Sequence, residues 1–159
     1  MKCLQRNKSF LYYALYKGKT YVQDTNGNRT GEYTVSYYNP VPLYANISAA
    51  RGTADLEEFG INLNYSKTIV LDDPFCPIDE HSVLWLGFDK ELPPFDSTAY
   101  YWEGMKVEYN SLFYRAKQYM GPGNFDSTKW EKIPYNYVVV SVARSINSVK
   151  YAIKEVDVS

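Results

Sequence analysis

The chain has 159 residues, of which 45% are hydrophobic and 17% aromatic, with 17 tyrosines among them. This length suits one domain built around a single core, and a second full-sized domain is not expected. Basic and acidic side chains number 17 and 18, so the formal net charge of −1 provides no overall attraction for nucleic acid or an anionic membrane. The many tyrosines favour β-strands and contact surfaces, which points toward binding or assembly.

Charge is distributed unevenly along the chain. Residues 1–35 contain six basic and two acidic side chains, whereas residues 46–100 contain ten acidic and three basic ones. Two surfaces of opposite charge would allow copies of the chain to meet head to tail, a type of contact that closes into rings. The alternative is that both stretches are ordinary solvated faces.

The first third of the chain has the pattern of a hairpin. Residues 10–38 are predicted to form one long hairpin around the polar Asn-Gly turn at residues 24–31. Pro40 and Pro42 interrupt it, because proline cannot donate a hydrogen bond to a central ladder. Further strands with alternating apolar residues are expected at residues 43–49, 61–71, 82–88, 137–144 and 148–154. Helical periodicity is weak throughout, so the predicted fold class is all-β.

A short aromatic stretch interrupts the later strands. Apolar or aromatic residues at 105, 107 and 109, and again at 112, 114 and 116, alternate with charged ones, which predicts two paired strands. Prolines flank the stretch at residues 93–94 and 134, as expected at the stiffened ends of an insertion. We therefore expect residues 1–95 and 134–159 to form a small β-barrel or sandwich, and residues 96–133 to form an inserted three-stranded β-module. A module of this size should lean on its host.

Residues with catalytic or metal-binding chemistry are few. His81 is the only histidine and follows Asp79 and Glu80, a cluster that would suit a metal or an acid/base pair but is more typical of a solvated turn. The acidic pairs at residues 72–73 and 79–80 would serve glycoside cleavage only if a cleft separated them. We therefore expect no catalytic residue, no metal and no cofactor, and a protein that is not an enzyme.

Two further features concern the cellular location. Cys3 and Cys76 belong to no CxxC motif or Cys/His pair and are expected to be free thiols in a reducing compartment. The polar, basic start of the chain predicts no signal peptide, and no apolar run is long enough for a membrane span. We expect synthesis in the cytoplasm and no membrane partner.

The aromatic side chains of the module divide into core and surface candidates. Val107, Tyr109, Tyr114 and Ala116 are expected in its core, and the surface candidates, which would stack on a sugar or a nucleobase, are Trp102, Tyr119 and Trp130. The segments Trp102-Glu103-Gly104, Val107-Glu108-Tyr109-Asn110 and Tyr114-Arg115-Ala116, with the later Trp130, resemble the small chitin-binding-like carbohydrate modules appended to chitinases and found in many phage proteins. The resemblance implies that fold for residues 96–133 and a glycan as its ligand. We also expect the module to project from the outer face of an assembly, where it would contact solvent, a neighbouring copy or an outer neck protein.

The remainder of the chain carries a second resemblance. Its blocks are Lys2-Cys3-Leu4, Tyr13-Ala14-Leu15-Tyr16, Ala45-Asn46-Ile47-Ser48-Ala49-Ala50-Arg51-Gly52, Glu58-Phe59-Gly60-Ile61, Cys76-Pro77-Ile78-Asp79-Glu80, Tyr137-Val138-Val139 and Val142-Ala143-Arg144-Ser145-Ile146-Asn147-Ser148. Together they resemble the head-closure proteins (head-tail connectors, or stoppers) of long-tailed bacteriophages. The resemblance implies a virion protein of the neck that forms a homo-oligomeric ring, usually of twelve or six copies. Such a ring docks beneath the portal or its adaptor, meets the tail-terminator protein and retains packaged DNA.

A ring of this kind has a bore through which DNA passes. Acidic residues that face the bore repel the phosphate backbone and let DNA slide without sequence-specific contact. We expect residues 50–60 to form the channel or gating loop, through Arg51, Gly52, Asp55, Glu57, Glu58, Phe59 and Gly60. The alternative function is a carbohydrate-binding or adhesin protein in which residues 96–133 are the binding part.

Overall fold

The computed structural model describes residues 8–49 and 65–156. In these ranges all regular secondary structure is β, which confirms the predicted fold class. The strands are β1 (Ser9–Ala14), β2 (Tyr16–Gln23), β3 (Arg29–Tyr37), β4 (Val41–Ala49), β5 (Lys67–Leu71), β6 (Val83–Leu86), β7 (Lys106–Tyr109), β8 (Leu112–Ala116), β9 (Trp130–Lys132), β10 (Tyr137–Arg144) and β11 (Val149–Glu155). Within the same ranges no helix is long and apolar enough to cross a membrane.

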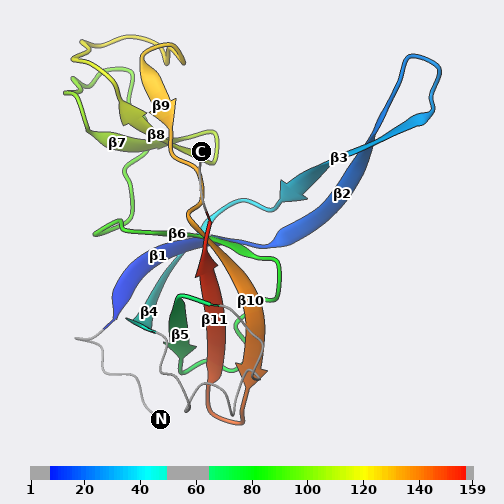
Figure 1. Ribbon diagram of the computed structural model, residues 1–159. Helices are drawn as coiled ribbons and strands as arrows, with labels where there is room; N and C mark the ends of the chain where they lie inside the picture. The colour runs from blue at the N-terminus through cyan, green and yellow to red at the C-terminus, as the bar shows by residue number, and fades with distance from the viewer. Residues whose placement is uncertain (1–7, 50–64, 157–159) are drawn as a thin grey trace.

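Six strands form a closed antiparallel barrel in the order β1-β4-β5-β11-β10-β6 (Figure 1). Leu11 pairs with Leu43 on one side and Leu86 on the other, so the three side chains share the inner face. Tyr151 and Ile69 pair in the same way and are fully buried. The predicted small barrel core is confirmed, because the alternating residues of its strands face one interior.

The predicted long hairpin is wrong in its first part. Strand β1 pairs with β4 and β6, and only β2 and β3 pair with each other. The physical reason is that residues 10–14 are buried on both faces, which a two-stranded hairpin cannot provide. The predicted turn is correct: the Asp24 carboxylate accepts hydrogen bonds from the Asn26 and Asn28 amides at 2.9 Å each. Gly27 supplies the positive φ of 82°.

Strand β4 begins earlier than its prolines suggest. It starts at Val41, so Pro42 lies inside it, opposite Tyr12. Pairing with β5 on the other side of β4 begins only at Asn46. Pro42 is tolerated because this end of β4 has a neighbouring strand on one side alone.

The inserted stretch forms a three-stranded sheet in the order β7-β8-β9. Asn110 and Ser111, with φ of 50° and 63°, make the two-residue turn between β7 and β8. Val107 and Ala116 are buried on one face, as expected, and Tyr109 and Tyr114 are half-buried beside Phe125.

The other face of this sheet rests on the barrel. Phe113 is 1% exposed, and its ring centroid lies 4.3 Å from that of Tyr12 and 5.2 Å from that of Trp85. The Tyr12 hydroxyl accepts a hydrogen bond from the Leu92 amide at 2.7 Å, and the Trp85 indole donates one to the Ile133 carbonyl at 3.1 Å. The module therefore leans on its host through an aromatic contact.

Candidate functional site

The hairpin β2–β3, hereafter the arm, projects away from the barrel (Figure 1). Lys19 pairs with Val35 and Tyr21 with Tyr33, so these four side chains share one face, hereafter the aromatic face of the arm. Thr20 and Thr34 pair on the opposite face. The arm is thus amphipathic, although Tyr21, Tyr33 and Val35 are 47%, 50% and 39% exposed.

Cationic side chains cover the exposed tyrosines of the arm. The Lys19 ammonium lies 4.4 Å from the Tyr33 ring centroid, and the Arg29 guanidinium lies 4.5 Å from that of Tyr21. The Tyr21 and Tyr33 rings meet edge to face at 6.3 Å. Glu32 follows the strand alternation onto the opposite face. The aromatic face of the arm is therefore both apolar and positively charged.

The arm is held at its base by the barrel. The Tyr38 amide donates to the Leu15 carbonyl at 2.9 Å, and the Tyr37 ring lies 5.9 Å from that of Tyr135. Burial raises the pKa of Tyr37 to about 12, and the neighbouring Tyr135 and Tyr16 hydroxyls add to this shift. A cavity of about 590 Å³ lies beside this base, lined by arm, barrel and module residues that include Val35, Trp85 and Leu112.

The acidic connection between β5 and β6 has structural roles. Asp73 accepts a hydrogen bond from the Phe75 amide at 2.9 Å, and Asp79 accepts one from the Ser82 hydroxyl at 2.8 Å. His81 is exposed with a φ of 74°, and its amide donates to the Val139 carbonyl at 3.1 Å. The described residues contain no group of histidine, cysteine and acidic side chains that could hold a metal. Cys76 is a buried free thiol, and Cys3 lies outside the described residues.

The module presents an exposed aromatic group. Trp102 and Tyr119 are 58% and 54% exposed, and their rings meet at 5.5 Å. Tyr100, which was not among the expected surface residues, is 55% exposed and stacks on Tyr119 at 6.5 Å. We call Tyr100, Trp102 and Tyr119 the aromatic trio.

Trp130 does not belong to the surface. It is 3% exposed, so its expected surface position is wrong. Trp130 pairs with Ala116 across β8 and β9, on the face that forms the module core. The small Ala116 side chain leaves room for the indole, which contacts the Tyr101 ring at 5.1 Å.

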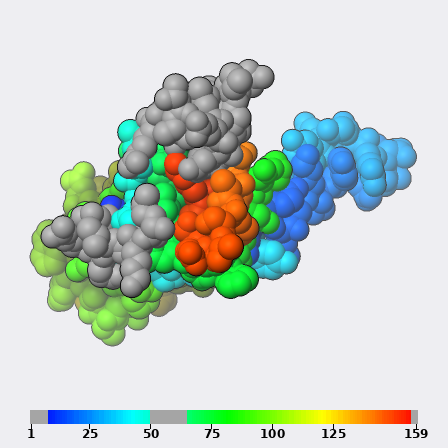
Figure 2. Space-filling view, turned by 90° about the horizontal axis from the view of Figure 1, so that it is seen from below, coloured from blue at the N-terminus to red at the C-terminus, as the bar shows by residue number. Residues whose placement is uncertain are grey.

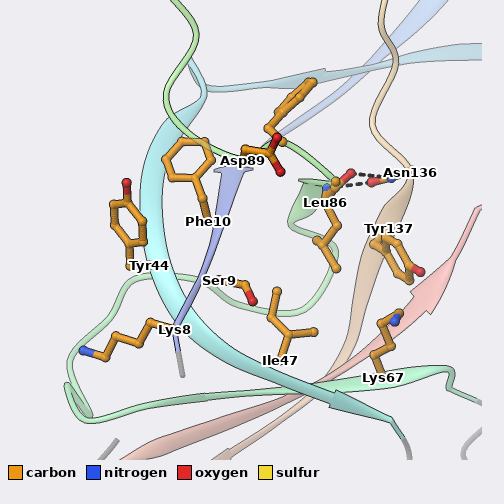
Figure 3. Close-up of a pocket in the computed structure, with 12 residues that line it drawn as sticks. Lys8, Ser9, Phe10, Tyr44, Ile47, Lys67, Leu86, Asp89, Asn136 and Tyr137 are labelled. Atoms are coloured by element: carbon orange, nitrogen blue, oxygen red, sulfur yellow. Dashed lines mark hydrogen bonds between the residues drawn. The ribbon is translucent and has the colours of Figure 1, made fainter. Parts of the chain in front are cut away.

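A further cavity of about 630 Å³ lies at the edge of the barrel (Figure 3). Its wall is held by Asn136, whose side chain accepts from the Leu86 amide at 2.9 Å and donates to the Leu86 carbonyl at 2.8 Å. Lys8 extends away from the cavity, whereas Lys67 lies beneath Tyr137 (Figure 3). The two ammonium groups do not converge, so they do not form an anion-binding pair.

The expected channel or gating loop, with Arg51, Gly52, Asp55, Glu57, Glu58, Phe59 and Gly60, lies outside the described residues. The arm was not selected as a site from the sequence, although its alternating Lys-Thr-Tyr and Tyr-Thr-Val segments carry the signal. Comparisons with protein-family models, curated proteins and solved structures found no match.

Proposed function

We propose that this protein is a structural virion protein of the neck of a long-tailed phage, where a homo-oligomeric ring closes the DNA-filled head. The observation that supports assembly is the arm. A two-stranded hairpin is marginally stable in water by itself, and this one keeps Tyr21 and Tyr33 about half exposed on an apolar, cationic face. Exposed tyrosine and arginine are typical of protein interfaces. A neighbouring subunit would cover this face and stabilise the arm.

In this proposal the closed barrel is the rigid wall of the ring. The ring binds the portal or its adaptor on one side and the tail-terminator protein on the other, and DNA passes through without sequence-specific contact. The channel loop expected at residues 50–60 stays a prediction from the sequence, in which its carboxylates repel the phosphate backbone. The module projects outward, because an insertion is accommodated where the connection already lies on the surface.

The proposal is tested by measuring the assembly state of the full chain. We expect light scattering after size exclusion to give a multimer and electron microscopy to show rings. Replacing Tyr21 and Tyr33 with serine should abolish assembly, whereas Glu32→Gln on the opposite face of the arm should not. A wild-type chain that stays monomeric at every concentration contradicts the proposal.

The alternative, a carbohydrate-binding protein, is supported by a different observation. The aromatic trio places three rings at the surface of one small module, and such rings stack on sugar faces. If this is the function, the chain should co-sediment with insoluble chitin, and Trp102→Ala should abolish binding while Leu112→Ala should not. Absence of binding to chitin and other polysaccharides by the wild-type chain would leave the assembly proposal as the better one.

A further inference from the structure

Two apolar side chains protrude at the end of the barrel opposite the arm. Phe75, in the β5–β6 connection, is 88% exposed, and Ile146, in the β10–β11 turn, is 91% exposed. Both line the same shallow cavity, so they form one surface, hereafter the Phe75–Ile146 patch. In Figure 1 the β10–β11 turn lies at the lower end of the barrel and the arm leaves toward the upper right, and Figure 2, seen from below, shows the turn at the surface.

The Phe75–Ile146 patch is held rigidly by hydrogen bonds. The Arg144 guanidinium donates to the carbonyls of Pro74 at 2.6 Å, Cys76 at 3.0 Å and Ile78 at 3.0 Å. Leu71 before Phe75, and Cys76 and Ile78 after it, are buried in the barrel core, so the loop is anchored on both sides. Phe75 therefore remains in solvent while its backbone is fixed. Binding of a partner over Phe75 would cost little conformational entropy, because the loop is already ordered.

The charge of this surface is opposite to that of the arm. Two exposed acidic residues, Asp72 and Asp73, directly precede Pro74 and Phe75 in the β5–β6 connection. Asp79 and Glu80 lie farther along this connection, next to His81, whose ring is 5.9 Å from that of Tyr16 at the base of the arm. Arg144, at the same end of the barrel, directs its guanidinium to backbone carbonyls. The aromatic face of the arm carries Lys19 and Arg29, and Lys17 lies at its base over Tyr38 at 5.6 Å.

Neither surface is complementary in charge to the same surface of a second copy. Two arms placed face to face would bring Lys19 and Arg29 of both copies together, and two Phe75–Ile146 patches would bring their acidic residues together. An arm against a patch instead pairs apolar with apolar and positive with negative side chains. The two surfaces lie at opposite ends of one barrel (Figure 1), so this contact repeats from copy to copy.

We infer that the aromatic face of the arm of one copy docks on the Phe75–Ile146 patch of the next copy. The inference rests on the proposed ring and identifies the contact that builds it. The contact is heterologous, so each subunit uses a different surface toward each of its two neighbours.

Two variants of the full chain test this contact. The patch variant carries Phe75→Ser and Ile146→Ser, and both side chains are so exposed that folding should not change. The arm variant carries Lys19→Glu and Tyr33→Ser. Each variant alone should be monomeric by light scattering, while an equimolar mixture should give a heterodimer and nothing larger, because only one intact pair of surfaces remains. Met105→Ser, at an exposed apolar residue of the module, is the matched control and should assemble like the wild type.

Failure of the arm–patch contact and failure of ring assembly give different results. A patch variant that assembles like the wild type overturns the inference, since arms would then meet each other or another surface, and leaves the ring intact. A monomeric wild-type chain overturns both. The patch variant by itself decides the question if the arm variant does not fold.

Discussion

Trp130 and Trp102 lie in the same small module but have different tasks. Trp130 is packed among the rings of Phe95, Tyr101 and Phe125, at 5.9, 5.1 and 5.8 Å, and is part of the only core that the module has in the described residues. Trp102 contacts Tyr119 at the surface. We therefore expect Trp130 to stabilise the module and Trp102 to be available for binding a ligand.

Substitution of the two tryptophans should separate these tasks. Trp130→Ala removes a fully packed indole and should lower the free energy of unfolding by about 3–5 kcal/mol. Trp102→Ala, the matched control, should change it by less than about 0.5 kcal/mol, because more than half of the side chain is in solvent. Chemical denaturation followed by circular dichroism measures both, and equal losses would contradict the assignment.

Arg144 holds the β5–β6 connection in place. Its guanidinium satisfies three backbone carbonyls of the β5–β6 connection. Arg144→Met should lower the free energy of unfolding by about 1–3 kcal/mol and speed hydrogen exchange at the Phe75 amide. Arg115→Met, at an exposed position of β8, is the control. Unchanged exchange at Phe75 would show that the connection is held by other contacts.

Among the elements, the module and the barrel depend on each other through aromatic side chains. Phe10, Tyr12 and Phe88 lie on the outer side of the barrel, and Phe113 of β8 completes their cluster. One face of the sheet β7-β8-β9 thus packs in the core of the module, and Phe113 on the other face packs against the barrel. The module is a covering layer as well as an insertion.

Excision of residues 96–133, with the ends joined by a short Gly/Ser turn, tests this dependence. We expect a soluble protein that melts cooperatively, because the closed barrel retains its interior. Its melting temperature should be lower than that of the full chain, since Tyr12 and Phe88 lose Phe113. Phe113→Ala in the full chain is the milder comparison. An unfolded or aggregated product would mean that the barrel cannot form without the module.

At the scale of the whole molecule, a closed barrel carries projections in different directions. The barrel has long-range strand pairing on every side, whereas the arm is bonded only to itself beyond its base. Local stability should follow this difference, because exposed hydrogen bonds open more readily than buried ones.

Hydrogen exchange should detect this contrast and its change on assembly. In dilute protein the amides of β2 and β3 should exchange much faster than those of β10 and β11. At concentrations where the chain assembles, β2 and β3 should become protected while β10 and β11 change little. An arm that exchanges equally fast in both conditions would contradict its burial in an interface.

Local patterns in the sequence determined the all-β class, the turn at Asp24–Asn28 and the strands of the module, because side-chain alternation and turn geometry depend on residues close together in the chain. Tertiary structure alone decided that β1 leaves the hairpin for the barrel, that Trp130 and Phe113 are buried, and that Phe75 stays in solvent. Each of these depends on which distant strand or surface covers a residue. A two-residue period specifies that a strand has two faces, but not what lies against either of them.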